Sequence, residues 1–146
     1  MVDQLSDRSL PTHVFAGIDR LQRRAGGEIG AHFDTAIPGM RGSFGLLLGI
    51  LPADGARASE LADLARISKQ AVGKRLEEMV ELGWVTMETD PADRRAKVVR
   101  RTPAGDAVRD TTDRAIAAME REWEAEIGPR SYATFKAVLD ELGQPR

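Results

Sequence analysis

Apolar residues recur every three or four positions along much of the chain, which is the spacing of an amphipathic helix. The pattern predicts long helices at about residues 13–37, 41–51, 103–127 and 131–142. Pro38-Gly39 and Gly128-Pro129 mark helix ends, because neither dipeptide continues a helix easily. Most of the chain is therefore expected to be helical.

Two shorter helices are predicted in the middle of the chain, at residues 59–65 and from Ser68 to Leu82. Ser68 is a favourable N-cap because its hydroxyl accepts a backbone N–H. Gly83 ends the second helix in the left-handed position that glycine adopts most cheaply. Two short helices joined by a tight turn indicate a helix-turn-helix.

After Gly83 the apolar period changes from helical to alternating. Residues 84–89 and 97–102 read as two strands, joined by the polar, doubly basic segment 90–96. This is a β-hairpin with a charged tip, called the wing below. The predicted fold class is mainly α with a small β-hairpin (α+β), a winged helix-turn-helix with flanking helices.

Composition restricts the class of protein. The 146 residues are 42% hydrophobic and 30% charged, as in soluble globular proteins. The longest apolar run, around residues 44–51, is broken by Gly45 and Gly49, and residues 1–9 lack a signal-peptide pattern. The absence of cysteine excludes disulfides and thiol chemistry. We expect a cytoplasmic protein with no membrane partner.

The net charge of −2 conceals a gradient along the chain. Residues 66–101 carry a net charge of +3, whereas residues 1–65 carry −2 and residues 102–146 carry −3. One basic segment between two acidic ones suits a protein that presents a single face to DNA. A chance excess of three charges is the alternative.

Polar and basic residues gather at the start of the second short helix. In a helix-turn-helix this part enters the major groove, where glutamine pairs with adenine and lysine reaches guanine or phosphate. A solvated polar face with a packing glycine at Gly73 is the alternative. The candidate DNA contacts here are Ser68, Lys69, Gln70, Lys74 and Arg75.

The tip of the wing carries Asp93, Arg94 and Arg95. An arginine on a hairpin can enter the minor groove, where it senses groove width and negative potential. Asp93 would then hold an arginine in place, most simply Arg95. The alternative is an ordinary solvated turn with salt bridges.

These pieces together resemble the MarR family. The resemblance rests on Ser59-Glu-Leu-Ala62, Ile67-Ser-Lys-Gln-Ala-Val72, Leu82-Gly-Trp-Val85, Asp90-Pro-Ala-Asp-Arg-Arg-Ala-Lys97 and Thr102-Pro-Ala-Gly105, in that order. It implies one MarR-like domain over residues 1–146, with dimerisation helices at 10–37 and 103–143 and a winged DNA-binding lobe at 41–102.

The resemblance also implies roles for single residues. Arg95 would be the minor-groove arginine, oriented by Asp93, with Arg94 near phosphate. Gly73 and Arg75 depart from the family's usual residues in the recognition helix, and Arg57 stands where a helix-capping threonine is frequent.

The last predicted helix carries an apolar face that a small winged lobe cannot cover alone, formed by Tyr132, Phe135, Val138, Leu139 and Leu142. Pairing with a partner's first helix would bury it, and packing within one chain is the alternative. Many relatives keep an effector pocket near the dimer helices. Here His32, Phe33, Phe44 and Leu48 are candidates for a small aromatic or other small effector, although such residues are more often simply core.

No catalytic set or metal site can be assembled from the sequence. His13 and His32 are the only histidines and have no carboxylate pattern beside them, and no phosphate loop or nucleophile motif is present. We therefore expect no enzyme and no cofactor. The predicted function is a homodimeric, sequence-specific DNA-binding transcription regulator, usually a repressor that a small effector releases from a pseudo-palindromic operator. The alternative is a winged-helix protein-interaction module that does not bind DNA.

Overall fold

A computed structural model describes residues 13–37 and 40–144 of the chain, without the side chains of residues 32–36. The predicted helices and the wing are all present, in the order α1 (Val14–Ala36), α2 (Gly42–Ile50), β1 (Ala56–Arg57), α3 (Ala58–Ala65), α4 (Lys69–Glu81), β2 (Val85–Asp90), β3 (Asp93–Arg101), α5 (Pro103–Ile127) and α6 (Pro129–Gly143). The expected fold class, mainly α with a β wing, is confirmed. The predicted stop at Pro38-Gly39 lies outside the described residues.

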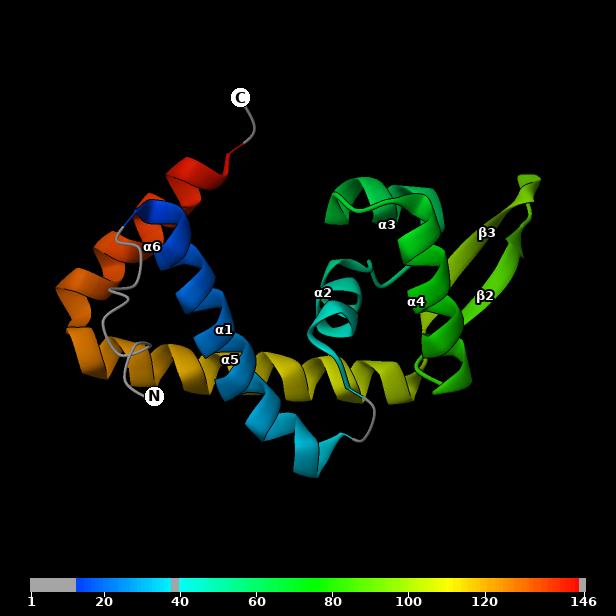
Figure 1. Cartoon of the computed structure of the whole chain (residues 1–146). Helices are drawn as coiled ribbons and strands as arrows, with labels where there is room; N and C mark the ends of the chain where they lie inside the picture. Colours follow the sequence, from blue (N-terminus) through cyan, green and yellow to red (C-terminus); the bar gives the residue numbers. More distant parts are fainter. Residues whose placement is uncertain (1–12, 38–39, 145–146) are drawn as a thin grey trace, which may run out of the picture.

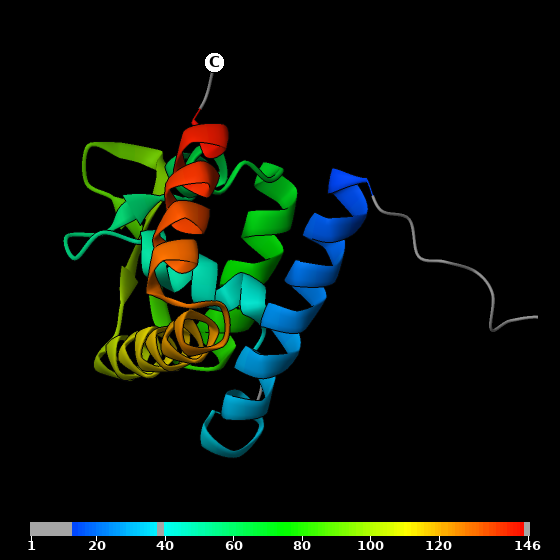
Figure 2. The same cartoon turned by 90° about the vertical axis from the view of Figure 1, so that its left-hand side faces the viewer.

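The long helix α5 forms the base on which the other elements are arranged (Figure 1). Helices α2, α3 and α4 and the wing gather over its amino-terminal part, while α1 and α6 lie at the other end. Figure 2 looks along α5 and shows α1 and α6 on different sides of it. The winged lobe therefore lies at one end of α5 and α6 at the other, while α1 crosses α5 and packs Ile29 against the core of the lobe.

The core lies inside the winged lobe, where α2, α3, α4 and the sheet meet. Phe44 packs edge-on against Trp84, with ring centroids 5.9 Å apart. The side chains with less than 2% exposure are Phe44, Leu47, Leu48, Leu61, Val72, Leu76, Met79, Val85 and Val99. Leu64 of α3, which helical spacing would place near the buried Leu61, is 62% exposed.

The sheet has three antiparallel strands in the order β1-β3-β2. Strand β1 was not predicted from the sequence, and β3 begins at residue 93 rather than at 97. Thr89 pairs with Lys97 but Asp90 pairs with Asp93, so residues 94–96 bulge out of the ladder. A bulge of this kind redirects the side chains it carries.

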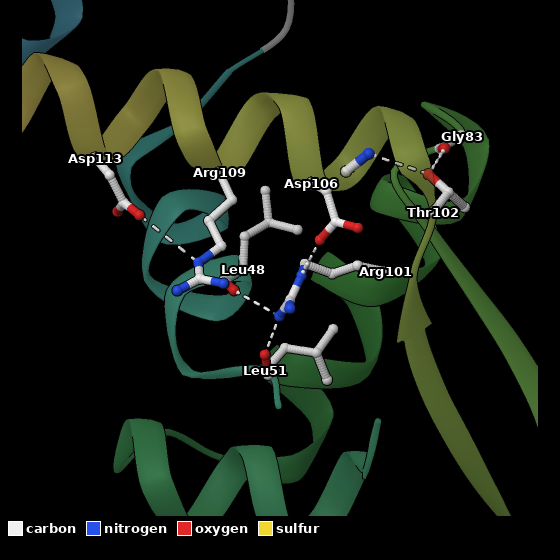
Figure 3. A network of polar contacts seen from close by, with 9 residues as sticks. Leu48, Leu51, Gly83, Arg101, Thr102, Asp106, Arg109 and Asp113 are labelled. Atoms are coloured by element: carbon white, nitrogen blue, oxygen red, sulfur yellow. Dashed lines mark hydrogen bonds and ion pairs between the residues drawn. The ribbon is translucent and has the colours of Figure 1, made fainter. Parts of the chain in front are cut away.

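Arg101, the last residue of the wing, joins the lobe to α5 (Figure 3). Its side chain is only 6% exposed, and its Nε donates to Asp106 on α5 at 2.6 Å. Its Nη1 donates to the carbonyls of Leu48, at 3.3 Å, and Leu51. The carbonyls at a helix end lack partners within the helix, so a buried arginine is satisfied there. The Arg101 side chain therefore holds β3, the end of α2 and the start of α5 together.

The start of α5 is equally well defined. Thr102 accepts the N–H of Gly105 at 3.1 Å and donates its hydroxyl to the carbonyl of Gly83 at 2.6 Å (Figure 3). Pro103 occupies the first turn, as the sequence predicts. The end of α4 and the start of α5 are therefore held together. None of the described helices is long and apolar enough to cross a membrane.

Candidate nucleic-acid interface

The amino-terminal half of α4 presents most of the predicted contact residues to solvent. Ser68 caps the helix by accepting the N–H of Ala71 at 3.2 Å. The side chains of Ser68, Lys69, Gln70 and Lys74 are exposed. Ser68, Gln70 and Lys74 also line one shallow hollow of about 590 Å³, so these three lie on a common face.

Gly73 lies on the same hollow. A Cβ added there would meet no atom of the described residues within 4 Å, so packing inside the chain gives no reason for a glycine. Glycine in a helix costs up to about 1 kcal/mol relative to alanine. The open space on this face is what a closely approaching partner requires.

Arg75 differs from the other predicted contacts on α4. It is half-buried, and its Nη1 is buried without a hydrogen-bond partner among the described residues. The structure does not bring it onto the face formed by Ser68, Gln70 and Lys74.

The wing displays Arg94 and Arg95 as exposed side chains in the bulge of β3. The carboxylate of Asp93 accepts the backbone N–H of Arg95 at 3.0 Å. Asp93 thus fixes the backbone of the bulge, whereas the sequence suggested that it holds the arginine side chain. The wing tip and the amino terminus of α4 lie at the same end of the molecule (Figure 1).

An ion pair that the sequence did not predict joins the start of α3 to the end of β2, next to the wing tip. Arg57 donates through Nε and Nη2 to Oδ2 of Asp90, at 2.9 and 2.6 Å. Asp90 is nearly buried and also accepts the N–H of Ala92 at 2.8 Å. The Ala92 N–H and then the Arg57 guanidinium hold the pKa of the Asp90 carboxyl below its usual range. The sequence signal for this pair is Arg57 itself, which stands where the MarR family frequently has a helix-capping threonine.

The candidate effector residues are placed only in part. Phe44 and Leu48 belong to the buried core, at 1% and 0% exposure, so neither offers surface to a ligand in this conformation. The side chains of His32 and Phe33 lie outside the described residues. Within the part of the chain that the structure describes, no group of three or more histidine, cysteine, aspartate or glutamate residues could hold a metal ion.

The terminal helices expose the apolar face noted in the sequence. Val138, Leu139 and Leu142 of α6 are 45%, 47% and 73% exposed, and Val14 and Phe15 of α1 are 74% and 79% exposed. A groove of about 470 Å³ separates α1 from α6 and is floored by Met119 and Trp123 of α5. Of the predicted face, the described part of the chain buries Tyr132 and half-buries Phe135, but it leaves Val138, Leu139 and Leu142 uncovered.

An ion-pair network clamps α1 to α5 beside that groove. Arg24 donates to Glu28 at 2.7 Å and to Glu126, and stacks over the Trp123 ring at 5.3 Å from its centroid. Trp123 in turn donates its indole N–H to Glu28 at 2.6 Å. The hydrogen bonds from Arg24, and for Glu28 also that from Trp123, lower the pKa of both glutamates. Helix α1, which forms one wall of the groove, is thereby held against α5, which forms its floor.

Comparison with known proteins shows what this arrangement is similar to. The model of the MarR family matches residues 37–96. No curated protein sequence matches the chain. Among solved structures, it is similar to a MarR family transcriptional regulator from Rhodococcus sp. RHA1, with 18% identity and a TM-score of 0.79 over 95% of this chain and 99% of that chain.

Two further solved structures are described as complexes, one with a natural ligand and one with duplex DNA. The PcaV transcriptional regulator from Streptomyces coelicolor, in complex with its natural ligand, is 19% identical, with a TM-score of 0.75 over 92% of this chain and 94% of that chain. The transcriptional repressor CouR bound to a 23-mer DNA duplex is 18% identical, with a TM-score of 0.76 over 90% and 93%. At these identities the similarity shows the fold.

Proposed function

We propose that the chain is a MarR family, non-enzymatic, DNA-binding transcription regulator. The MarR family model matches residues 37–96, which hold the helix-turn-helix and the first part of the wing. The observation that carries the proposal is that two exposed polar segments lie at one end of the molecule (Figure 1): the amino-terminal part of α4, with Ser68, Gln70 and Lys74, and the wing tip, with Arg94 and Arg95. One helix in the major groove and one basic hairpin in the adjacent minor groove would use all of these side chains.

The proposal includes a homodimer on a pseudo-palindromic operator. The exposed apolar residues of α1 and α6 and the groove between these helices support it, because a second copy would bury a face that a single chain leaves open. Two winged lobes would then reach half-sites about 10 bp apart, centre to centre.

Repression and release by a small effector complete the proposal. They are supported by relatives of the same fold, since CouR is described as a repressor bound to duplex DNA and PcaV as a complex with its natural ligand. The joint at Arg101 supports coupling between the two parts, because it fixes the lobe against the helix that runs to the dimer end.

The substitution Arg95→Ala tests the DNA-binding face. Loss of a specific groove contact should cost about 1–3 kcal/mol in operator affinity at fixed salt. Arg114→Ala is the matched control, because it removes the same charge from an exposed position in the middle of α5. Affinity within about twofold of the unaltered protein for Arg95→Ala would refute the role of this residue.

Salt dependence tests DNA binding as a whole. Each phosphate contact steepens the loss of affinity with rising salt, with a log–log slope of roughly −0.9 per phosphate. A protein-interaction module would show no duplex binding at any salt concentration.

A further inference from the structure

We propose that Arg57 is a positioning residue for the wing, which acts through Asp90 to orient the bulge that carries Arg94 and Arg95. The proposal rests on the DNA-binding function proposed above and gives a role to residues outside the predicted contact set.

Arg57 lies where β1 ends and α3 begins, at the N-cap of the first helix of the helix-turn-helix. Its backbone N–H donates to the carboxylate of Glu60 at 2.8 Å, which holds the residue against α3. Its guanidinium reaches the far end of the wing and binds Asp90 through two nitrogens. The Asp90 side chain is only 12% exposed. One side chain thus ties the helix-turn-helix to the wing tip.

Hydrogen bonds continue from Asp90 to the backbone of Arg95. Oδ1 of Asp90 accepts the N–H of Ala92 at 2.8 Å. The next residue, Asp93, accepts the N–H of Arg95 at 3.0 Å. These contacts, linked by the peptide bond between Ala92 and Asp93, lead from α3 to the residue proposed to enter the minor groove.

Polar contacts are needed here because packing and the strand ladder do not fix the bulge. Residues 91–95 are all exposed, and residues 94–96 have no partners on β2. A hollow of about 470 Å³ lies between the bulge and the start of α3, bordered by Arg57 and Arg95. A segment with few apolar contacts takes its orientation from its hydrogen bonds.

Two variants of the full chain separate positioning from direct electrostatics. Arg57→Ala removes the donor, and Asp90→Asn removes the carboxylate charge while keeping an oxygen that can accept the Ala92 N–H. Charge alone predicts that Asp90→Asn binds DNA more tightly, because a negative charge disappears near the phosphates. Positioning predicts the opposite: both variants bind a selected duplex about three- to tenfold more weakly at fixed salt.

The same two changes are then made in the Arg95→Ala background. If Arg57 acts through Arg95, each change should lower affinity there by less than about twofold, since interacting sites are not additive. Amide hydrogen exchange of Ala92 and Arg95 in the free protein should also quicken in both variants, which reports loosening without DNA. Arg57→Lys keeps the charge but offers a single donor nitrogen, so it should recover only part of the loss.

Three results would overturn the inference. One is tighter binding by Asp90→Asn, and another is undiminished binding by Arg57→Ala. The third is an equal loss of duplex affinity for Arg57→Ala in the presence and in the absence of the Arg95 side chain, together with a log–log salt dependence whose slope falls by about one. That result would make Arg57 a direct phosphate contact. If the unaltered protein binds no duplex at all, the proposed function itself fails, which is a distinguishable outcome.

Discussion

Gly105 is the position where the structure predicts the largest effect of adding one methyl group. It is buried in the first turn of α5, and a Cβ there would lie 1.9 Å from the carbonyl oxygen of Trp84. Ordinary contact begins at 3.4 Å, so the start of α5 would have to move away by roughly 1.5 Å. That movement would break the bonds from the Thr102 N–H to Trp84, at 3.0 Å, and from the Gly105 N–H to Thr102.

The expected magnitude follows from these contacts. Overpacking and lost hydrogen bonds cost about 3–5 kcal/mol together, whereas alanine gains up to about 1 kcal/mol over glycine in a helix. A net loss of about 2–4 kcal/mol should lower Tm by roughly 5–15 °C for a chain of this size.

Thermal unfolding at fixed protein concentration measures this effect. Gly49→Ala is the matched control, because Gly49 is exposed in α2 and a Cβ there would meet no described atom within 4 Å. It should leave Tm unchanged or raise it. A Gly105→Ala protein that unfolds at or above the Tm of the unaltered chain would refute the predicted clash.

Three further predictions concern the lobe and the wing. Gly73→Ala should raise the free energy of unfolding by about 0.5–1 kcal/mol yet weaken duplex binding; unchanged binding would show that DNA does not need the space at Gly73. Arg101→Met should lower the free energy of urea unfolding by about 2–3 kcal/mol, because two helix-end carbonyls lose their donor, and Asp106→Asn should cost less because Asp106 is 56% exposed. An equal loss of unfolding free energy in both variants would show that the Arg101–Asp106 ion pair, and not the contacts with the carbonyls, provides the stability. The lowered pKa of Asp90 in the folded chain gives stability that is present above the ordinary carboxyl pKa of about 4 and is lost as pH falls through the folded value. Asp90→Asn should therefore flatten the acid side of a Tm-against-pH curve, and an unchanged curve would contradict this.

Most elements were predictable because their signals are local. Ser68 caps α4 as its position suggests, and Gly83 adopts the left-handed conformation with φ of +73°. Thr102 and Pro103 open α5 in the same way. Caps and helical periodicity depend on residues within one or two turns, so a single sequence carries them.

The missed features depend on residues far apart in the chain. Strand β1 has two residues, too few for any periodicity, and exists because Ala56 and Arg57 pair with Val99 and Val98. Arg57 and Asp90 are 33 positions apart, and nothing local marks them as partners. The exposure of Leu64 likewise depends on which neighbours reach α3, which helical spacing does not specify.

Of the candidate site, the residue types were predictable but their geometry was not. The α4 face and the wing tip came from order and spacing along the chain. The half-buried state of Arg75 and the use of Asp93 as a backbone acceptor follow from tertiary packing and from the bulge in β3.

Selection of bound duplexes from a random pool measures whether the protein binds specific DNA sequences as a dimer. We expect enrichment of a pseudo-palindrome whose half-site centres lie about 10 bp apart, with two chains on each duplex. Failure to enrich any sequence at low salt, or a single chain bound to an asymmetric site, would contradict this expectation.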